Sequence, residues 1–290
     1  MSTTLAEQRR QKATTKSPAQ APALKLRNDL ERLLESARGL ELTPKGRSRL
    51  SAEVQKSAAA LNGLLAELDP IDRPSAVFDP GNPRTVGYFV ALALSAQPRR
   101  PLAALKDFYG TGVYALYYRG AFGAYQPISG SDTPIYVGMA VYEPTDRKDV
   151  SAMGTSLAIR LGEHRKNIQR AAETLNVDDF DYRALVVQSG WEGPAETHLI
   201  RMFHPIWNKE TKILQGFGKH GDSIKTRANK RSPWDTLHAG RNWAGGEGQT
   251  DKKTPSQIEG ELRMHFEKTT VYKSFEDVFA SFVSGLRQSD

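Results

Sequence analysis

Residues 110–140, GTGVYALYYRGAFGAYQPISGSDTPIYVGMA, decide the fold of this chain. Two runs within them, GVYALYY and TPIYVGM, are rich in aromatic and β-branched residues, which is typical of strands. Each run places a tyrosine close to a glycine: Tyr114 in the first run and Tyr136 in the second. A polar, glycine-rich segment, GAFGAYQPISGSD, separates the two runs. The stretch therefore predicts two strands joined as a hairpin.

The residues that follow extend this hairpin into a layered fold. Residues 155–175 have the pattern of a long, basic amphipathic helix, DYRALVVQ reads as a third strand, and residues 194–204 form another helix after it. The order β-β-α-β-α predicts an α/β (α+β) fold, in which helices flank a small, mainly antiparallel sheet of three strands.

The N-terminal part is predicted to be helical after a polar tail. Residues 1–22 have the composition of a disordered tail. Leucines at helical spacing then predict a helix that closes near Gly39, and a second helix begins at Thr43 and ends at Asp69. We interpret this hairpin as a packing element without chemistry. A short apolar helix, GYFVALALSAQ, follows and stops at Pro98.

The C-terminal part opens with a basic, loop-like segment. Between Lys209 and Arg241 there are eight Lys or Arg against three Asp or Glu, a local excess of five positive charges. A loop of this length is functional or disordered, and Trp234 and Trp243 argue against disorder. Two amphipathic stretches follow, QIEGELRMHF and SFEDVFASFVSGL. We expect the rest of the fold or a partner subunit to bury their apolar face.

Composition narrows the class of protein. The 290 residues carry a net charge of +7, which points to an anionic partner, nucleic acid first, although ribosomal, chaperone and metabolic proteins can be equally basic. The absence of cysteine excludes disulfides, thiolate nucleophiles and cysteine-ligated zinc. No apolar run approaches the roughly 20 residues of a membrane helix. We therefore expect a soluble, intracellular protein that does not bind membranes.

Four further polar residues are candidates for chemistry. Arg160 and His164 lie four residues apart on one predicted helix and share a face. Glu196 stands at the start of the helix after the third strand, and Asn208 follows it. Each has an ordinary explanation in solvation, helix-dipole charge or turn formation. Together with the two tyrosines they provide what phosphodiester hydrolysis needs: a proton acceptor, a cation, a metal ligand and orienting hydrogen bonds.

The two half-motifs carry a family resemblance. GVY at 112–114 and YVG at 136–138 are similar to the sequences that name the GIY-YIG nucleases, and Arg160, Glu196 and Asn208 follow in that family's order. The family's core would span residues 110–210.

Two departures from the common GIY-YIG pattern narrow the resemblance. The 21 residues between Tyr114 and Tyr136 exceed the spacing of most members, and His164 stands where many members carry a tyrosine. With VFDPGNPRTVGYF, GFGKHG and RSPWDTLHAGR, these features resemble a group of type II restriction enzymes that read CCGCGG.

This resemblance implies a role for each site residue. Tyr114 would remove the proton of the attacking water, directly or through a bridging group, and His164 would bond to Tyr114 or the water and relay that proton. Arg160 would contact the scissile phosphate, and Tyr136 would position the water or a phosphate oxygen. The remaining roles concern the cation: Glu196 would hold Mg²⁺ (or Mn²⁺) as its single protein carboxylate, and Asn208 would orient Glu196 or the phosphate.

The resemblance also implies double-stranded DNA as the partner. In that group, loops inserted into and flanking the core contact the bases, so we expect residues 211–250 and the inserted hairpin to bind DNA. The expected contacts are Lys219, Lys225, Arg227, Lys230, Arg231 and Arg241. Arginine suits guanine and lysine suits phosphate. Cutting both strands of a palindrome implies a homodimer or homotetramer, and a restriction enzyme would work in the bacterial cytoplasm.

The regions on either side of the core complete the expected organisation. The helical N-terminal region would span residues 23–109, and a C-terminal helical extension would span residues 251–290. The C-terminal helices could extend a dimer or join dimers.

Two other functions fit the same residues. A structure-specific repair or homing nuclease would share the core, but such enzymes usually append separate DNA-binding modules, which are not apparent here. A catalytically dead DNA-binding protein would retain the fold, but all six expected polar positions carry competent residues. Cleavage of plasmid DNA at fixed sites separates these alternatives.

Overall fold

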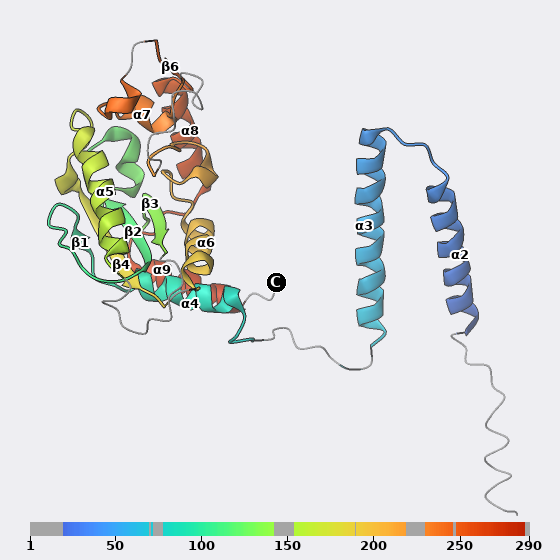
Figure 1. Cartoon of the computed structure of the whole chain (residues 1–290). Coiled ribbons are helices and arrows are strands. Elements are labelled where there is room, and N and C mark those ends of the chain that lie inside the picture. The colour runs from blue at the N-terminus through green and yellow to red at the C-terminus, as the bar shows by residue number, and fades with distance from the viewer. Residues whose placement is uncertain are drawn as a thin grey trace, which may run out of the picture. The chain divides into compact units, whose positions relative to one another are not determined.

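The computed structural model describes residues 20–69, 71, 78–141, 154–188, 190–218, 230–245 and 248–287. The chain divides into two compact units, Met1–Arg73 and Pro74–Asp290 (Figure 1). The first unit contains helix α2 (Gln20–Arg38) and helix α3 (Pro44–Glu67). Helix α2 begins within the predicted tail, of which residues 1–19 lie outside the described residues.

Both predicted helix boundaries around residues 39–43 are confirmed. Helix α2 ends directly before Gly39, and the Thr43 hydroxyl caps α3 by accepting a hydrogen bond from the Gly46 amide at 3.2 Å. The predicted apolar stripes are present but exposed: Leu33 is 65% exposed and Leu65 is 62% exposed. No residue of α3 is buried, so these helices do not build a core of their own.

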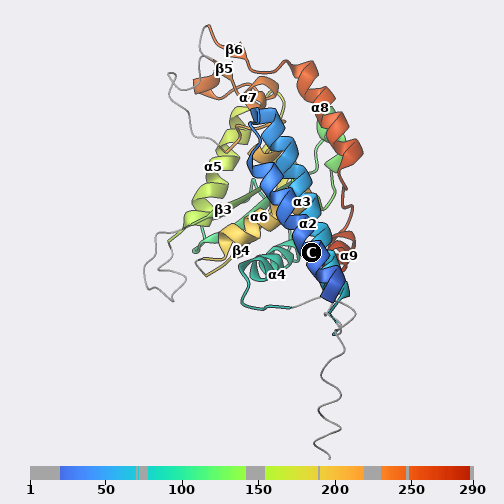
Figure 2. The same cartoon turned by 90° about the vertical axis from the view of Figure 1, so that its right-hand side faces the viewer.

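The second unit is built around a four-stranded antiparallel sheet (Figures 1 and 2). Its strand order is β1-β4-β2-β3, with bounds β1 Arg100–Pro101, β2 Gly112–Tyr118, β3 Tyr136–Ala140 and β4 Phe180–Val186. The three predicted strands are confirmed, and β1 adds a two-residue edge. Helices α5 (Ser156–Arg170) and α6 (Glu192–Phe203) occupy their predicted places, which confirms the order β-β-α-β-α.

Strand β2 lies inside the sheet, and all seven of its residues are buried. Because side chains alternate along a strand, β2 contributes to a separate core on each face of the sheet. Tyr114, Leu116 and Tyr118 pack with α5 and α8 (Pro255–Lys268). The alternate residues pack on the other face with α4 (Pro83–Ser95), α6 and α9 (Phe275–Arg287). Helix α4, expected to start at residue 87, begins four residues earlier, and it belongs to the sheet-containing unit.

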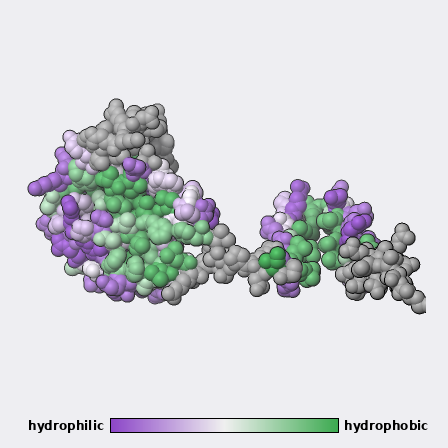
Figure 3. Space-filling model, turned by 90° about the horizontal axis from the view of Figure 1, so that it is seen from below, coloured by the Kyte–Doolittle hydropathy of each residue, from purple (hydrophilic) through white to green (hydrophobic). Residues whose placement is uncertain are grey.

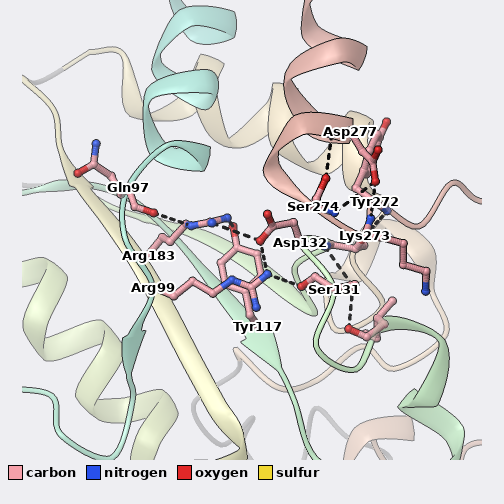
Figure 4. A network of polar contacts seen from close by, with 12 residues as sticks. Gln97, Arg99, Tyr117, Ser131, Asp132, Arg183, Tyr272, Lys273, Ser274 and Asp277 are labelled. Atoms are coloured by element: carbon pink, nitrogen blue, oxygen red, sulfur yellow. Dashed lines mark hydrogen bonds and ion pairs between the residues drawn. The ribbon is translucent and has the colours of Figure 1, made fainter.

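A polar network fixes the end of the insertion between β2 and β3 (Figure 4). Arg183 Nη2 lies 3.2 Å from the Asp132 carboxylate, which Arg99 also binds. The two guanidinium groups lie 4.8 Å and 4.2 Å from the centre of the Tyr117 ring. Because Asp132 comes just before β3, this network lets β3 enter the sheet in a fixed register after a long insertion.

The described parts of the two segments predicted to bind DNA contact the core and each other. The insertion contains the 3₁₀ helix η1 (Gly123–Ile128), in which Tyr125 is fully buried. The Tyr125 hydroxyl accepts a hydrogen bond from Trp207 Nε1 at 2.9 Å and bonds to His238 Nε2. These contacts join the insertion to the segment after Asn208.

The segment after Asn208 contains several short elements. They are η4 (Lys209–Thr211), β5 (Lys230–Arg231), α7 (Pro233–Leu237), η5 (Asn242–Ala244) and β6 (Thr250–Asp251). Strand β5 pairs with β6 in parallel. Residues 219–229 lie outside the described residues.

The C-terminal helices exist as predicted, and the apolar face of α9 is partly covered. Val278 and Phe282 are buried against α4 and α6, whereas Phe279 is 47% exposed and Leu286 is 49% exposed. Figure 3 shows apolar side chains gathered on this unit as seen from below. The rest of the fold therefore covers only part of that face. None of the described helices combines the length and the apolar character that a membrane crossing requires.

Candidate active site

The register of the β2–β3 hairpin brings the two motif tyrosines together. Tyr114 lies opposite Gly138, and Leu116 lies opposite Tyr136. Residues opposite each other in an antiparallel pair project to the same face, so the two tyrosines share one face of the sheet. Their ring centres lie 6.2 Å apart. The sequence half-motifs thus form a single site although 21 residues separate their tyrosines.

Each half-motif contains a glycine at a position where a side chain would clash with its neighbours. A β-carbon at Gly112 would lie 2.8 Å from the Val187 amide nitrogen, where β2 pairs with β4. A β-carbon at Gly138 would lie 2.5 Å from Tyr114 Cζ, so the Tyr114 ring occupies the space that any side chain at position 138 would need. Gly138 therefore determines where the Tyr114 hydroxyl can lie.

Helix α5 supplies a histidine to that hydroxyl. His164 Nε2 lies 2.7 Å from Tyr114 Oη, and either atom can donate, depending on the histidine tautomer. Both side chains are buried, and the His164 ring also lies 4.9 Å from the Tyr136 ring. The structure therefore brings together the tyrosine and histidine that sequence reasoning placed in one proton-transfer step.

One turn earlier on α5, Arg160 supplies the expected cation. Its Nη1 bonds to Glu163 Oε2 at 2.9 Å, and 32% of its side chain is exposed. Arg160 also interacts electrostatically with Tyr114 and Tyr136. The guanidinium thus lies at the edge of the buried pair, where a phosphate group can reach it.

Glu196 approaches the same site from helix α6. This helix begins at Glu192, earlier than predicted, so Glu196 falls in its second turn. The half-buried carboxylate accepts a hydrogen bond from the Met139 amide of β3. Helix α6 packs closely against helix α4 at Gly87. A β-carbon at Gly87 would lie only 2.6 Å from the Pro194 carbonyl carbon of α6. Five of the six predicted site residues therefore converge.

Asn208 bonds to the backbone of strand β3. Its Oδ1 accepts a hydrogen bond from the Val137 amide at 2.9 Å, and its Nδ2 donates to the Val137 carbonyl at 2.9 Å. Strand β3 is an edge strand, so these backbone groups would otherwise lack a partner in the sheet. Asn208 anchors the chain after α6 to β3, and its predicted role in orienting Glu196 or the phosphate stays a prediction.

Burial keeps both tyrosines protonated. The pKa of Tyr136 is raised to about 12, mainly by burial and also by the Glu196 charge, whose effect Arg160 opposes. Burial also raises the pKa of Tyr114 well above its usual value. At neutral pH the two side chains are therefore neutral hydroxyls. Tyr114 can accept a proton only if it gives up its own, and the adjacent His164 can take that proton.

Glu196 is the carboxylate best placed to hold a cation. Burial raises its pKa, and the nearby Glu210 charge raises it further, whereas Lys209 opposes the shift. Among the described residues there is no group of three or more histidine, aspartate and glutamate side chains that could hold a metal ion. A single half-buried carboxylate fits Mg²⁺, which keeps several of its waters, and does not fit a closed zinc site.

The six residues expected to contact DNA lie in different surroundings. Lys219, Lys225 and Arg227 lie outside the described residues. Lys230 is exposed in β5, as a phosphate contact requires. Arg231 Nε lies 2.8 Å from Asp251 Oδ1, and 33% of its side chain is exposed.

Arg241 is a correction to the predicted DNA contacts. Its side chain is only 1% exposed, and its Nε bonds to Asp235 Oδ1 at 2.6 Å. Its Nη1 and Nη2 donate to the carbonyl oxygens of Phe217 and Gly216 at 3.2 Å and 3.0 Å. With these donors occupied inside the protein, the guanidinium supports the core and is not presented to a guanine.

Sequence reasoning missed two residues at the site. Glu210 acts electrostatically on both Glu196 and Tyr136, and the ring of Phe217 stacks on His164. The only signal for Phe217 was its position in GFGKHG. Nothing in the spacing of Glu210 distinguished it from a surface charge.

The family described as the Eco29kI GIY-YIG domain matches residues 106–266. That range includes the whole sheet from β2 to β4, all six predicted polar positions and the Arg241–Asp235 pair. No curated protein matches the chain.

Replacing Gly138 with alanine tests the steric account of the hairpin. The added methyl group would force the Tyr114 ring to move, and we expect Gly138→Ala to lower the free energy of unfolding by about 1–3 kcal/mol. The matched control is Gly162→Ala in helix α5, where an added β-carbon meets nothing within 4 Å. There we expect stabilisation of roughly 0.5–1 kcal/mol. Urea denaturation measures both, and equal effects of the two changes would contradict the account.

Replacing Glu196 with glutamine tests the electrostatics. Because the folded-state pKa of Glu196 is raised, the wild-type protein loses stability as pH rises from the unfolded-state pKa through the folded-state pKa. Glutamine resembles the protonated form, so Glu196→Gln should raise the thermal midpoint at neutral pH in EDTA, and the gain should vanish in acid. The exposed Glu259→Gln serves as control, with no gain expected. A lower midpoint for Glu196→Gln at neutral pH would contradict the account.

Proposed function

The chain belongs to the Eco29kI GIY-YIG domain family, and we propose that it is a type II restriction endonuclease that cuts both strands of palindromic DNA. A GIY-YIG restriction endonuclease domain acts as a nuclease on DNA. The observation that carries the proposal is the buried Tyr114–His164 pair at 2.7 Å, with Arg160 and Glu196 beside it. This set contains a proton acceptor, a phosphate-binding cation and a metal ligand, as phosphodiester hydrolysis requires.

The proposed proton transfer uses both members of the pair. The water that attacks phosphorus gives its proton to Tyr114 Oη, while the Tyr114 proton passes to His164 Nε2. Tyr114 thus remains a neutral hydroxyl before and after the step, in agreement with its raised pKa. His164 ends the step as an imidazolium, whose charge is opposite to that developing on the phosphoryl oxygens. The water's oxygen forms the new bond to phosphorus, and the sugar oxygen leaves.

Two neighbouring side chains bind the phosphate in this proposal. Arg160 exchanges Glu163 for the scissile phosphate and offsets the charge that develops on its oxygens. The protonated Tyr136 hydroxyl donates a hydrogen bond to the water or to a phosphoryl oxygen. Glu163 then serves to hold Arg160 in place while DNA is absent.

Glu196 would hold Mg²⁺, for which Mn²⁺ can substitute. When bound, the ion would stabilise negative charge on the leaving oxygen. Asn208 supports this arrangement indirectly, because it fixes strand β3, whose Met139 amide donates to the Glu196 carboxylate.

The proposed substrate is double-stranded DNA containing CCGCGG. The resemblance of the chain to enzymes that read this palindrome supports the sequence, and arginine side chains suit its guanines. Lys219, Lys225, Arg227, Lys230 and Arg231 remain the proposed DNA contacts, without Arg241. We propose a homodimer or homotetramer, because a palindrome cut on both strands needs two active sites. The exposed apolar residues of α9 are suited to such an assembly.

Cleavage of plasmid DNA tests the proposal. Wild-type protein and the Glu196→Gln variant are incubated with plasmid and Mg²⁺, and the ends of all fragments are sequenced. We expect discrete ends within CCGCGG for the wild type, with no cleavage by the variant or in EDTA.

Each other outcome has a definite meaning. Discrete ends at another palindrome would overturn the recognition sequence alone, and cutting only at branches would indicate a repair nuclease. Salt-sensitive binding without any cleavage would indicate a catalytically dead protein. Undiminished cutting by Glu196→Gln would contradict the assigned metal ligand.

A further inference from the structure

The imidazole of His164 is held by an aromatic side chain from outside the segment that carries the predicted site residues. The Phe217 ring stacks on His164 with 4.6 Å between ring centres and 19° between ring planes. Phe217 is fully buried, so no water separates the two faces. A flat ring stacked at this distance prevents the imidazole from tilting. The stack therefore keeps His164 Nε2 directed at the Tyr114 hydroxyl.

The turn that carries Phe217 touches the second tyrosine as well. The Phe217 ring lies edge-on to Tyr136, with 5.2 Å between ring centres. A β-carbon at the next residue, Gly218, would lie 2.8 Å from Tyr136 Oη. The same short turn thus borders both His164 and Tyr136.

A buried ion pair holds this turn in place. Arg241 donates to the carbonyl oxygens of Gly216 and Phe217, and it bonds to Asp235 and lies 4.4 Å from the centre of the Trp234 ring. Burying an arginine costs free energy unless its N–H groups form hydrogen bonds or ion pairs. Apolar residues of similar volume would often stabilise the fold as well or better. The pair fixes the backbone on both sides of the Gly216–Phe217 peptide.

Gly216 adds a steric constraint on the same backbone. Its φ is +122°, a conformation that favours glycine, and a β-carbon there would lie 2.5 Å from Ser232 Cβ. Ser232 is the N-cap of helix α7 and bonds to Asp235, the partner of Arg241. Turn, helix cap and ion pair therefore form one unit behind Phe217.

We propose that Phe217 is a positioning residue for proton transfer, which sets the orientation of His164 toward Tyr114, and that Arg241 and Asp235 hold Phe217 for this task. The catalytic consequence rests on the proposed nuclease function, whereas the effect on His164 does not. Phe217 does not touch the reacting atoms; it acts through His164. Phe217 also packs against Trp207 and Trp234. The test must therefore distinguish a loss of packing from a change in the orientation of His164.

The chain offers a matched control in Phe180. This side chain is also fully buried in the same core, and its ring neighbours are Tyr118 and Trp207. Phe217→Leu and Phe180→Leu remove the same flat ring from the same core and replace it with a similar apolar volume. Only the first variant removes the ring that is stacked on His164.

The first measurement is single-turnover cleavage of an oligonucleotide duplex. We expect Phe217→Leu to lower the cleavage rate constant at least ~10-fold, because small displacements of a catalytic group are costly. Phe180→Leu should stay within roughly twofold of the wild type at a similar loss of thermal midpoint. Duplex affinity in Ca²⁺ should be the same for all three proteins. A wild-type rate for Phe217→Leu, or equal loss in both variants, would overturn the proposal.

The second measurement does not depend on nuclease activity. The full chain is labelled with ¹⁵N-histidine, and His164 is identified among the six histidines through His164→Gln. We expect the side-chain nitrogen signals of His164 to shift or broaden in Phe217→Leu and to stay unchanged in Phe180→Leu. Unchanged His164 signals in Phe217→Leu would overturn the proposal. If the wild type cuts no DNA, the proposed function fails, and this spectrum alone decides the role of Phe217.

Discussion

The site depends on one steric constraint: the residue opposite Tyr114 in the sheet must have no side chain. Only because position 138 is glycine can the Tyr114 ring lie across β3 and place its hydroxyl 2.7 Å from His164 Nε2. The register that creates this pairing is fixed at the far end of the insertion by the Asp132 network. The two tyrosines therefore meet across the hairpin although a long insertion separates them.

Burial then determines the chemistry that this geometry can perform. It raises the pKa of both tyrosines and of Glu196, so the site without a cation contains neutral hydroxyls and a carboxylate that is costly to ionise. Arg160 partly offsets this cost. Such a site is less stable than an apolar one, a common consequence of function. Its ionised carboxylate is stabilised when a cation binds, which couples cation binding to protein stability.

Local signals in the sequence predicted the elements well, and tertiary contacts explain what they missed. The cap at Thr43, the strands and the order β-β-α-β-α depend on neighbouring residues, which a pattern can show. The internal partners of Arg241 and Asn208 were not predicted, because they lie 24 and 71 residues away in the sequence. An arginine in a basic segment has the same residue type whether it contacts DNA or a buried carbonyl. The leucine stripes of α2 and α3 predicted helices correctly, and several of these leucines are exposed.

The most direct test of the account is the single-turnover cleavage rate of Tyr114→Phe. This variant keeps the ring that packs against Gly138 and removes only the hydroxyl that contacts His164. We predict a rate at least ~100-fold below wild type, with unchanged duplex affinity in Ca²⁺, because the proton path is interrupted. A Tyr114→Phe protein that cleaves at the wild-type rate would contradict it.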